Sequence, residues 1–389
     1  MKTRRLLMLP LAVAAIAMAR ADSEPDTTNV VAALEAKIAK GEVKLAYAPG
    51  GHGYLESVLK ALKLSPESQV LPFTSSSLQF DRITPKTPRT LYFNDDVSVG
   101  AVHPGGLIEI LANDRRGGIV FYTLDNNAPD PKAPGTPKLV EESARCAVCH
   151  GMVTNVAPGW IVANIIATAD GMPQIPNPAH PFDVTDQTRA FEDRWGGWYV
   201  TGKTENMRHL GNITAPDPDK PYDLPAEAGQ TLASLADRFD PAHALKPTSD
   251  IVALMTLEHQ TGFTNRVFVL NKQYSDAGLD DLVAYMTFAS EVPLPGPIQG
   301  NSGFTADFAR RGPFDGKGRT LRSFDLGHRL FRYPLSYMVY GTAFESLPPD
   351  TRDKLYRQLY DALKARGADG ADAIAILAAT KTGLPGYWK

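Results

Sequence analysis

The sequence predicts an α+β protein, with a small antiparallel sheet in an N-terminal module and a mainly helical, loop-rich region after it. Apolar runs typical of strands lie before residue 125, whereas helical spacing of apolar residues dominates after residue 141. A proline-rich connector at 127–137 separates the two regions. Glycine and proline, with 32 and 31 residues, are spread along the chain and indicate many ordered loops.

The composition is that of a globular chain. Of its 389 residues, 43% are hydrophobic and 21% are charged, close to averages of roughly 45–50% and 25%. These values exclude a largely disordered chain and a protein that crosses a membrane many times. The formal net charge is −3 without a block of like charges. Because nucleic-acid binding needs a basic patch or stripe, it is not expected.

Residues 1–21 have the features of a secretory signal peptide. Three basic residues lie among the first five, the stretch 6–19 is apolar and uncharged, and Ala-Arg-Ala at 19–21 fits a cleavage site. The apolar stretch is shorter than the ~20 residues that span a bilayer. We therefore expect a mature chain that begins at Asp22, has no membrane span, and is periplasmic or secreted.

In the expected N-terminal module, residues 22–140, two helices precede three β-rich runs. The helices are expected at 29–40 and 54–64 from their apolar spacing. The β-rich runs lie at 89–102, 107–113 and 118–124. Turn sequences at 103–106 and 114–118 separate the runs, so they predict a small antiparallel meander.

The expected second domain, residues 141–389, consists of helix and loop. A short helix is expected at 141–144. Further helices are expected at 231–239, 250–261, 280–289, 337–345, 350–365 and 371–380. A second proline-rich break lies at 293–297.

The two cysteines of the chain carry its most specific motif. They are Cys146 and Cys149, and His150 follows directly, so the segment reads C-x-x-C-H. This is the attachment sequence for c-type haem, in which two thiols reach the two vinyl groups and the histidine is the proximal iron ligand. A zinc site would need two more soft ligands, and a redox-active dithiol would usually follow a strand. We therefore expect one haem c per chain and a cytochrome c-like haem domain with a helical C-terminal extension.

The sixth iron ligand is open at this point, and three side chains are the main candidates. Met207 and His209 lie in one expected loop, 57 and 59 positions beyond His150. His259 lies on an apolar face of the helix expected at 250–261, where a hydrogen-bonded core histidine is the simpler interpretation. Met255, Met338 and an open position are further alternatives. A methionine favours electron transfer, whereas an open position permits peroxide or substrate chemistry.

An aromatic cluster follows the motif in sequence. Trp195 and Trp198 flank two glycines, which suggests backbone packed against something flat, either the haem or ordinary core. Arg194 or Arg208 is a candidate to pair with a haem propionate. Glu258 is a weaker candidate for an acid or base near the distal side.

Several segments together resemble a group of exported bacterial monohaem proteins described as cytochrome c domain-containing. They are C-x-x-C-H and the segments RWGGWYVTG at 194–202, RHLGN at 208–212, LEHQT at 257–261 and RYPLSY at 332–337. The resemblance covers most of the mature chain and implies a haem protein without implying an activity. Thr204 stands where related chains carry a histidine, which places more weight on His209 and His259.

Two functions follow from these observations. The first is a periplasmic electron carrier that passes one electron between a redox partner protein, or a small-molecule donor or acceptor, and its haem iron. The second is a monohaem oxidoreductase, similar to a peroxidase or oxidase, with His209 and Arg208 in a distal pocket. The single haem favours the carrier, and we expect a side chain from the 207–209 loop or the His259 helix to close the iron. Whether the protein is an enzyme is left open by the sequence.

Overall fold

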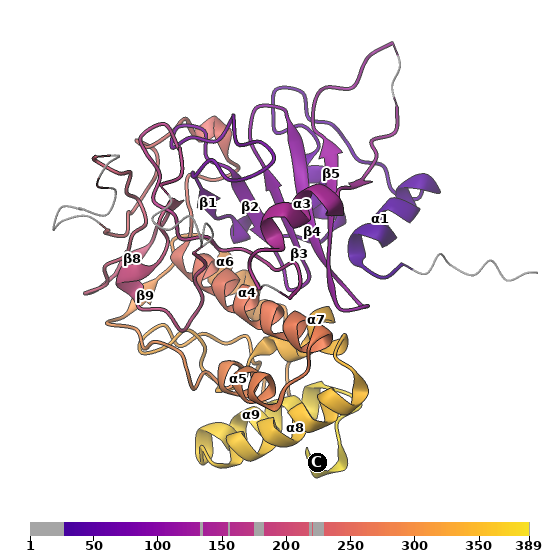
Figure 1. The fold of residues 1–389 in the computed structure, drawn as a ribbon, viewed down its shortest axis with the longest axis vertical. Coiled ribbons are helices and arrows are strands. Elements are labelled where there is room, and N and C mark those ends of the chain that lie inside the picture. Colours follow the sequence, from indigo (N-terminus) through magenta and orange to yellow (C-terminus); the bar gives the residue numbers. More distant parts are fainter. Residues whose placement is uncertain are drawn as a thin grey trace, which may run out of the picture.

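The computed structural model describes residues 27–132, 135–154, 156–174, 183–217, 220 and 229–388. The expected signal peptide lies outside these residues. Within them, helices and antiparallel sheets occur together, which confirms the α+β class (Figure 1). No helix in the described ranges has both the length and the apolar character needed to cross a membrane.

The largest sheet is an antiparallel meander of five strands in sequence order. Its strands are β2 (Thr90–Phe93), β3 (Val97–Ala101), β4 (Leu107–Asp114), β5 (Gly118–Asp125) and β6 (Val140–Glu141). The single run expected at 89–102 forms two strands because Asn94 makes a tight turn. Its side-chain Oδ1 accepts hydrogen bonds from the backbone N–H groups of Asp96 and Val97, an Asx turn that reverses the chain.

One face of this sheet packs against two N-terminal helices, α1 (Val30–Ala39) and α2 (Leu55–Ala61). Alternate strand residues such as Tyr92, Val99 and Ile110 are buried there. Asn29 caps α1 by accepting hydrogen bonds from the N–H groups of the first turn. Because side chains alternate along a strand, the other face of the sheet is left for the residues that follow.

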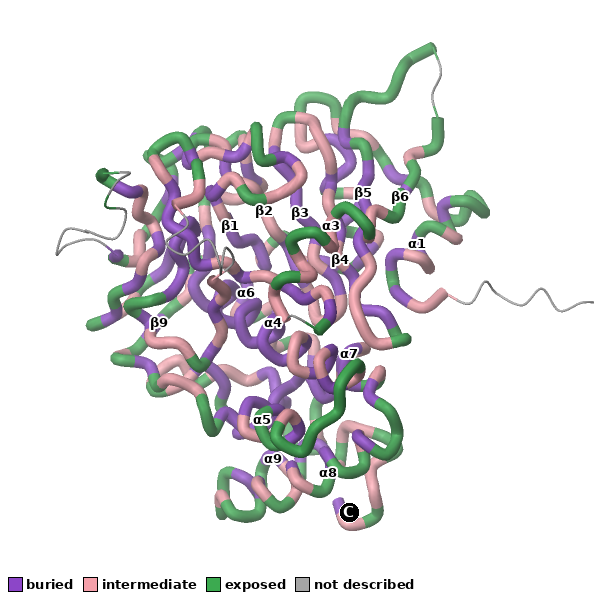
Figure 2. Tube along the Cα trace, viewed as in Figure 1, coloured by how far each residue is buried: buried purple, intermediate pink, exposed green. Residues whose placement is uncertain are grey.

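The helical region is built around α4 (Ile251–Lys272), which is buried along most of its length (Figures 1 and 2). Asp250 caps this helix, and Ser275 caps α5 (Asp276–Met286). The remaining helices are α3 (Ser143–His150), α6 (Phe304–Arg310), α7 (Thr342–Glu345), α8 (Pro349–Lys364) and α9 (Ala368–Thr380). Short 3-10 turns cover Pro66–Ser68, Phe191–Asp193, Pro241–His243, Tyr337–Tyr340 and Gly386–Trp388. The helix expected at 337–345 is therefore a 3-10 turn followed by a single α-helical turn.

The prediction of a helix at 231–239 is wrong, since this segment contains only turns, bends and isolated bridges. Its helical spacing has another cause: Leu235 and Phe239 pack, as parts of a loop, against Leu71, Phe73 and Tyr199. The backbone of Leu232 bonds to Val200 and Gly202 instead of to its own segment. Tertiary packing has thus produced the apolar pattern without a helix.

The regions expected as separate domains are closely joined. Strand β1 (Leu71–Pro72) pairs with β7 (Trp198–Tyr199), while β8 (Lys203–Thr204) pairs with β9 (Ile298–Gln299). Strand β6 continues the N-terminal sheet across the boundary expected at residue 140. Phe93 and Val70 belong to the same apolar core as α4. Strand pairing and the core around α4 therefore cross the expected boundary, while the second apolar core, with α1 and α2, has its buried residues before residue 140.

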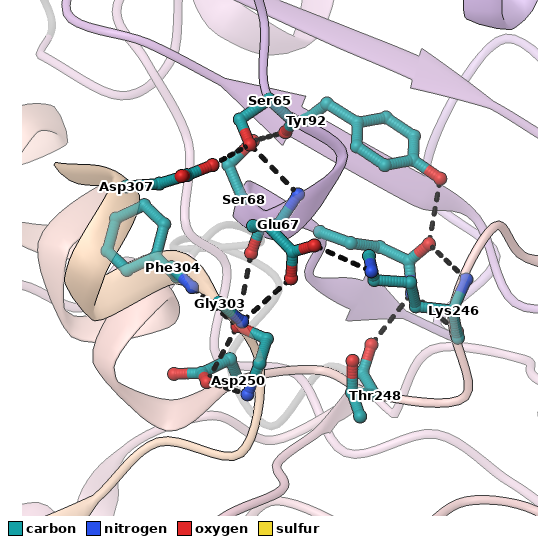
Figure 3. A network of polar contacts seen from close by, with 12 residues as sticks. Ser65, Glu67, Ser68, Tyr92, Lys246, Thr248, Asp250, Gly303, Phe304 and Asp307 are labelled. Carbon is teal, nitrogen blue, oxygen red and sulfur yellow. Dashed lines mark hydrogen bonds and ion pairs between the residues drawn. The ribbon is translucent and has the colours of Figure 1, made fainter.

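A polar network strengthens this junction (Figure 3). Glu67 pairs with Lys246 at 2.6 Å and accepts a hydrogen bond from the Gly303 N–H at 2.7 Å. The Ser65 hydroxyl donates to Asp307 at 2.5 Å. Gly303 lies just before α6, and Asp307 lies within it. The N-terminal module is thus tied to two distant parts of the helical region.

Candidate functional site

Helix α3 presents the three residues of the C-x-x-C-H motif on one face. Counted from Cys146, Cys149 is three positions and His150 four positions further along α3. Residues with these spacings are neighbours on a helix surface. The helix expected to precede the motif therefore contains it. Both cysteines are free thiols, with Cys149 exposed and Cys146 half-buried, and no residue of α3 is fully buried.

All three side chains line one cavity of about 390 Å³ between α3 and the second face of the large sheet. This volume lies within the roughly 300–1,000 Å³ typical of small-molecule and cofactor sites. Register explains the residues of its floor. Leu91, Gly100, Glu109 and Thr123 lie side by side across four strands, and Ser98, Leu111 and Phe121 form the next row. The loop 75–80, the segment 160–173 and Leu257 of α4 supply the remaining walls.

His150 is held in the orientation that a metal ligand requires. Its Nδ1 lies 2.6 Å from the carbonyl oxygen of Gly159, and because a carbonyl only accepts, Nδ1 carries the proton and Nε2 keeps its lone pair. Burial lowers the pKa of His150 to about 4. The imidazole is therefore neutral at neutral pH, which is the form that binds a metal.

The segment after the motif is fixed by two asparagines. Asn265 of α4 accepts a hydrogen bond from the Trp160 N–H at 2.8 Å, and its amide donates to the Trp160 carbonyl at 3.0 Å. The indole N–H of Trp160 donates to Asn113 of β4 at 2.9 Å. Because Gly159 directly precedes Trp160, these bonds position the carbonyl that orients His150.

The thiol of Cys146 is not suited to dithiol redox chemistry. Burial raises its pKa to about 11, and the nearby carboxylate of Glu109 contributes in the same direction. At neutral pH this thiol is protonated, whereas redox-active cysteines have a lowered pKa that provides the thiolate.

A charged pair, Arg89 and Glu109, also lines the cavity. Arg89 lies just before β2 and Glu109 lies on β4, so the pair spans the intervening strand β3. Sequence reasoning missed both residues, because a charged side chain that alternates with apolar ones on a strand has the pattern of a solvent-facing residue. The sequence contains no signal that distinguishes a polar residue in a cavity from one at the surface.

The structure places Met207 and His209 away from this cavity, since neither is among its lining residues. His209 is buried against Trp195, with ring centroids 5.1 Å apart. Its Nδ1 accepts a hydrogen bond from the Gly211 N–H, and its Nε2 bonds to the Thr231 hydroxyl. Both ring nitrogens of His209 are thus engaged within the protein, and the structure brings neither Met207 nor His209 to the cavity of the C-x-x-C-H motif.

His259 is a buried core residue rather than a cavity residue. Its Nδ1 bonds to the Gln187 side-chain oxygen at 2.6 Å, and its Nε2 bonds to the Ser336 hydroxyl at 2.7 Å. Its ring stacks on Tyr285 with an interplanar angle of 4°. Helix α4 contributes Leu257 to the cavity, whereas His259 is not among the lining residues, so the structure does not bring this candidate ligand to the C-x-x-C-H motif.

The other residues proposed to contact the haem also lie elsewhere. Trp195 packs against Phe191 and His209, and Trp198 donates its indole N–H to the Ala163 carbonyl at 2.6 Å. Arg208 is exposed, on the loop that follows Trp198. None of the three lines the cavity. Their glycine-rich segment serves ordinary core packing, which was the alternative interpretation of this cluster.

No protein-family model, curated protein or solved structure matches this chain. Within the described ranges, no group of three or more His, Cys, Asp or Glu side chains is arranged to hold a metal ion by itself. The chemistry of the cavity is therefore inferred from its own residues.

The buried His259 predicts a loss of stability in acid. Burial lowers its pKa from 6.5 to about 3, so the unfolded chain binds a proton that the folded chain excludes. Its contribution is full above pH 6.5 and falls as the pH drops toward 3. We expect His259→Gln to reduce the dependence of the unfolding free energy on pH between 6 and 4 by about 1.4 kcal/mol per pH unit.

Urea unfolding at several pH values measures this slope. His328→Gln is the matched control, because the His328 side chain is 92% exposed, and it should leave the slope unchanged. Equal slopes in the wild-type protein and His259→Gln would contradict the prediction.

Proposed function

We propose that this chain is an exported c-type cytochrome that carries one haem and works in electron transfer. Thioether bonds from Cys146 and Cys149 would hold the haem, and His150 would bind its iron from the proximal side. The observation that carries the proposal is that all three side chains line one cavity, with the Nδ1 of His150 held by the Gly159 carbonyl. This bond leaves Nε2 for the metal, as is usual for histidine ligands.

The haem would supply a one-electron couple, and the protein would bind it, orient it and limit its contact with water. Leu91, Leu111 and Ile165 give the cavity an apolar lining. Cys149 is exposed and α3 has no buried residue, so the attachment edge lies at the surface. This exposure supports electron exchange with a redox partner protein or a small-molecule donor or acceptor.

The proposal includes export, which rests on the sequence of residues 1–21. Haem c is attached outside the cytoplasm to an unfolded chain, so a signal peptide and a C-x-x-C-H motif support one another. We propose a periplasmic or secreted location for the mature protein.

A second candidate function is a monohaem oxidoreductase that acts on a small substrate. The observation in its favour is the Arg89–Glu109 pair, which places a positive and a negative group in the cavity that His150 lines. Acid–base and charge-stabilising groups beside a reaction centre are typical of enzymes. This pair replaces Arg208 and His209, the residues that the sequence suggested for the same role.

Reductive titration in a spectroelectrochemical cell distinguishes the two functions. For an electron carrier we expect uptake of one electron per chain, full reversibility, and no catalytic consumption of hydrogen peroxide in the presence of a donor. Sustained peroxide turnover would contradict the carrier and support the enzyme. A chain without any reversible couple would contradict both.

A further inference from the structure

Arg89 reaches Glu109 because the residue between them has no side chain. Gly100 lies beside Glu109 in the β3–β4 register. A Cβ atom at Gly100 would approach the Arg89 Nε to 2.6 Å and its Cζ to 2.8 Å, far inside normal contact. The guanidinium therefore lies over Gly100 and forms an ion pair with the Glu109 carboxylate.

This ion pair leaves hydrogen-bonding capacity unused. The Arg89 Nε and the Glu109 Oε1 are buried and have no hydrogen-bond partner among the described residues, while the Glu109 Oε2 is engaged only by the ion pair with Arg89. Buried polar groups are nearly always partnered in folded proteins. The pair of Arg322 and Asp95 shows the ordinary arrangement, with two parallel hydrogen bonds between them and a third from Arg322 to the Gly312 carbonyl.

We propose that Arg89 and Glu109 form a binding site for a small weak acid inside the cavity, and this inference rests on the proposed haem function. The acid would give its proton to a Glu109 oxygen, while the electron pair of the broken bond stays on the ligand. The resulting anion would accept hydrogen bonds from the Arg89 guanidinium. One bond to hydrogen breaks and one O–H bond forms, so charge and protons balance within the pair.

The charge of the pair favours such a ligand over a haem propionate. A propionate is already ionised when it arrives and would meet the negative Glu109 beside Arg89. A neutral acid avoids this repulsion, because its proton neutralises Glu109 as its anion forms. The other titratable or charged side chains that line the cavity are Tyr122 on β5 and Arg145, Cys146, Cys149 and His150 on α3.

Azide is a suitable probe, because hydrazoic acid is a small weak acid and azide binding to ferric haem changes the visible spectrum. We expect the oxidised holoprotein to bind azide with an affinity that falls about tenfold per pH unit between pH 6 and 8, since each azide takes up one proton. Glu109→Gln should remove this pH dependence and weaken binding at pH 6.

Arg89→Gln should weaken azide binding by roughly 10- to 100-fold at pH 6, the effect expected when one charge-assisted hydrogen bond is lost. Arg310→Gln is the matched control, because its side chain is 70% exposed, pairs with Asp307 and does not line the cavity, and it should change the affinity less than threefold. If Arg89→Gln yields too little holoprotein, Arg89→Lys keeps the charge without the fork and should still bind azide more weakly than the wild type.

Three results would overturn the inference while leaving the haem proposal intact. They are a wild-type holoprotein that binds no azide, unchanged azide affinity in both Arg89 variants, and tighter binding or an unchanged pH dependence in Glu109→Gln. Failure of the haem proposal is distinguishable, because the wild-type chain would then have no haem absorbance before azide is added.

Discussion

Replacing Cys146 and Cys149 together by alanine is expected to abolish covalent haem attachment. The two sulfurs line the same cavity as His150, and without them no thioether bond can form. A denaturing gel stained for haem should show a band for the wild-type chain and none for the double variant. Replacing His150 by alanine should also prevent stable assembly, because it removes the axial ligand.

Val148→Ala is the matched control for this experiment. Val148 lies between the two cysteines on α3, and the residue is 68% exposed. The variant should keep the stained band at wild-type intensity. A band that persists in the double cysteine variant, or haem that acid–acetone extracts from the native wild type, would show that attachment is not through these sulfurs.

Arg194→Ala is expected to destabilise the folded protein by about 3–5 kcal/mol, the usual cost of leaving a buried charge without its partner. Arg194 and Glu258 are almost fully buried, and the Arg194 Nη1 lies 3.3 Å from a Glu258 oxygen. Arg194 also donates to the carbonyls of Gln187 and Arg189 and lies over the Phe191 ring. The variant removes all of these contacts and leaves Glu258 with the Thr185 hydroxyl but without its charge partner. Urea or thermal unfolding measures the change.

Arg189→Ala is the control, since Arg189 forms an ion pair with Asp183 in which both side chains are about one-third exposed. Exposed pairs contribute about 0–1 kcal/mol, so this variant should remain close to the wild type. Similar losses of unfolding free energy in the two variants would show that the buried Arg194–Glu258 pair stabilises the protein no more than an exposed pair does.

Local features of the fold could be predicted from the sequence because local interactions determine them. Asp250 caps α4 at the position where the sequence places the start of a helix, and helical spacing identified α8 and α9, whereas α5 begins four residues before its expected start. The alternating pattern and the turn sequences identified the three β-rich runs that form strands β2 to β5 of the meander. The C-x-x-C-H motif is likewise local, since its three side chains share one helical turn.

The composition of the cavity could not be predicted, because it depends on register and on packing between distant segments. Glu109 and Arg89 meet only because β3 places Gly100 between them. His209 and His259 have the chemistry of iron ligands, yet hydrogen bonds within the core use their ring nitrogens. A residue type identifies what a side chain can bind, whereas only the fold determines which cavity it lines.

The mass of the purified mature chain shows whether a haem is covalently attached. We expect a mass that exceeds that of the polypeptide by one haem, with neither Cys146 nor Cys149 available to a thiol reagent after denaturation. The added mass should remain after denaturation, because thioether bonds are covalent. An unmodified mass with two reactive thiols would show that Cys146 and Cys149 hold no haem.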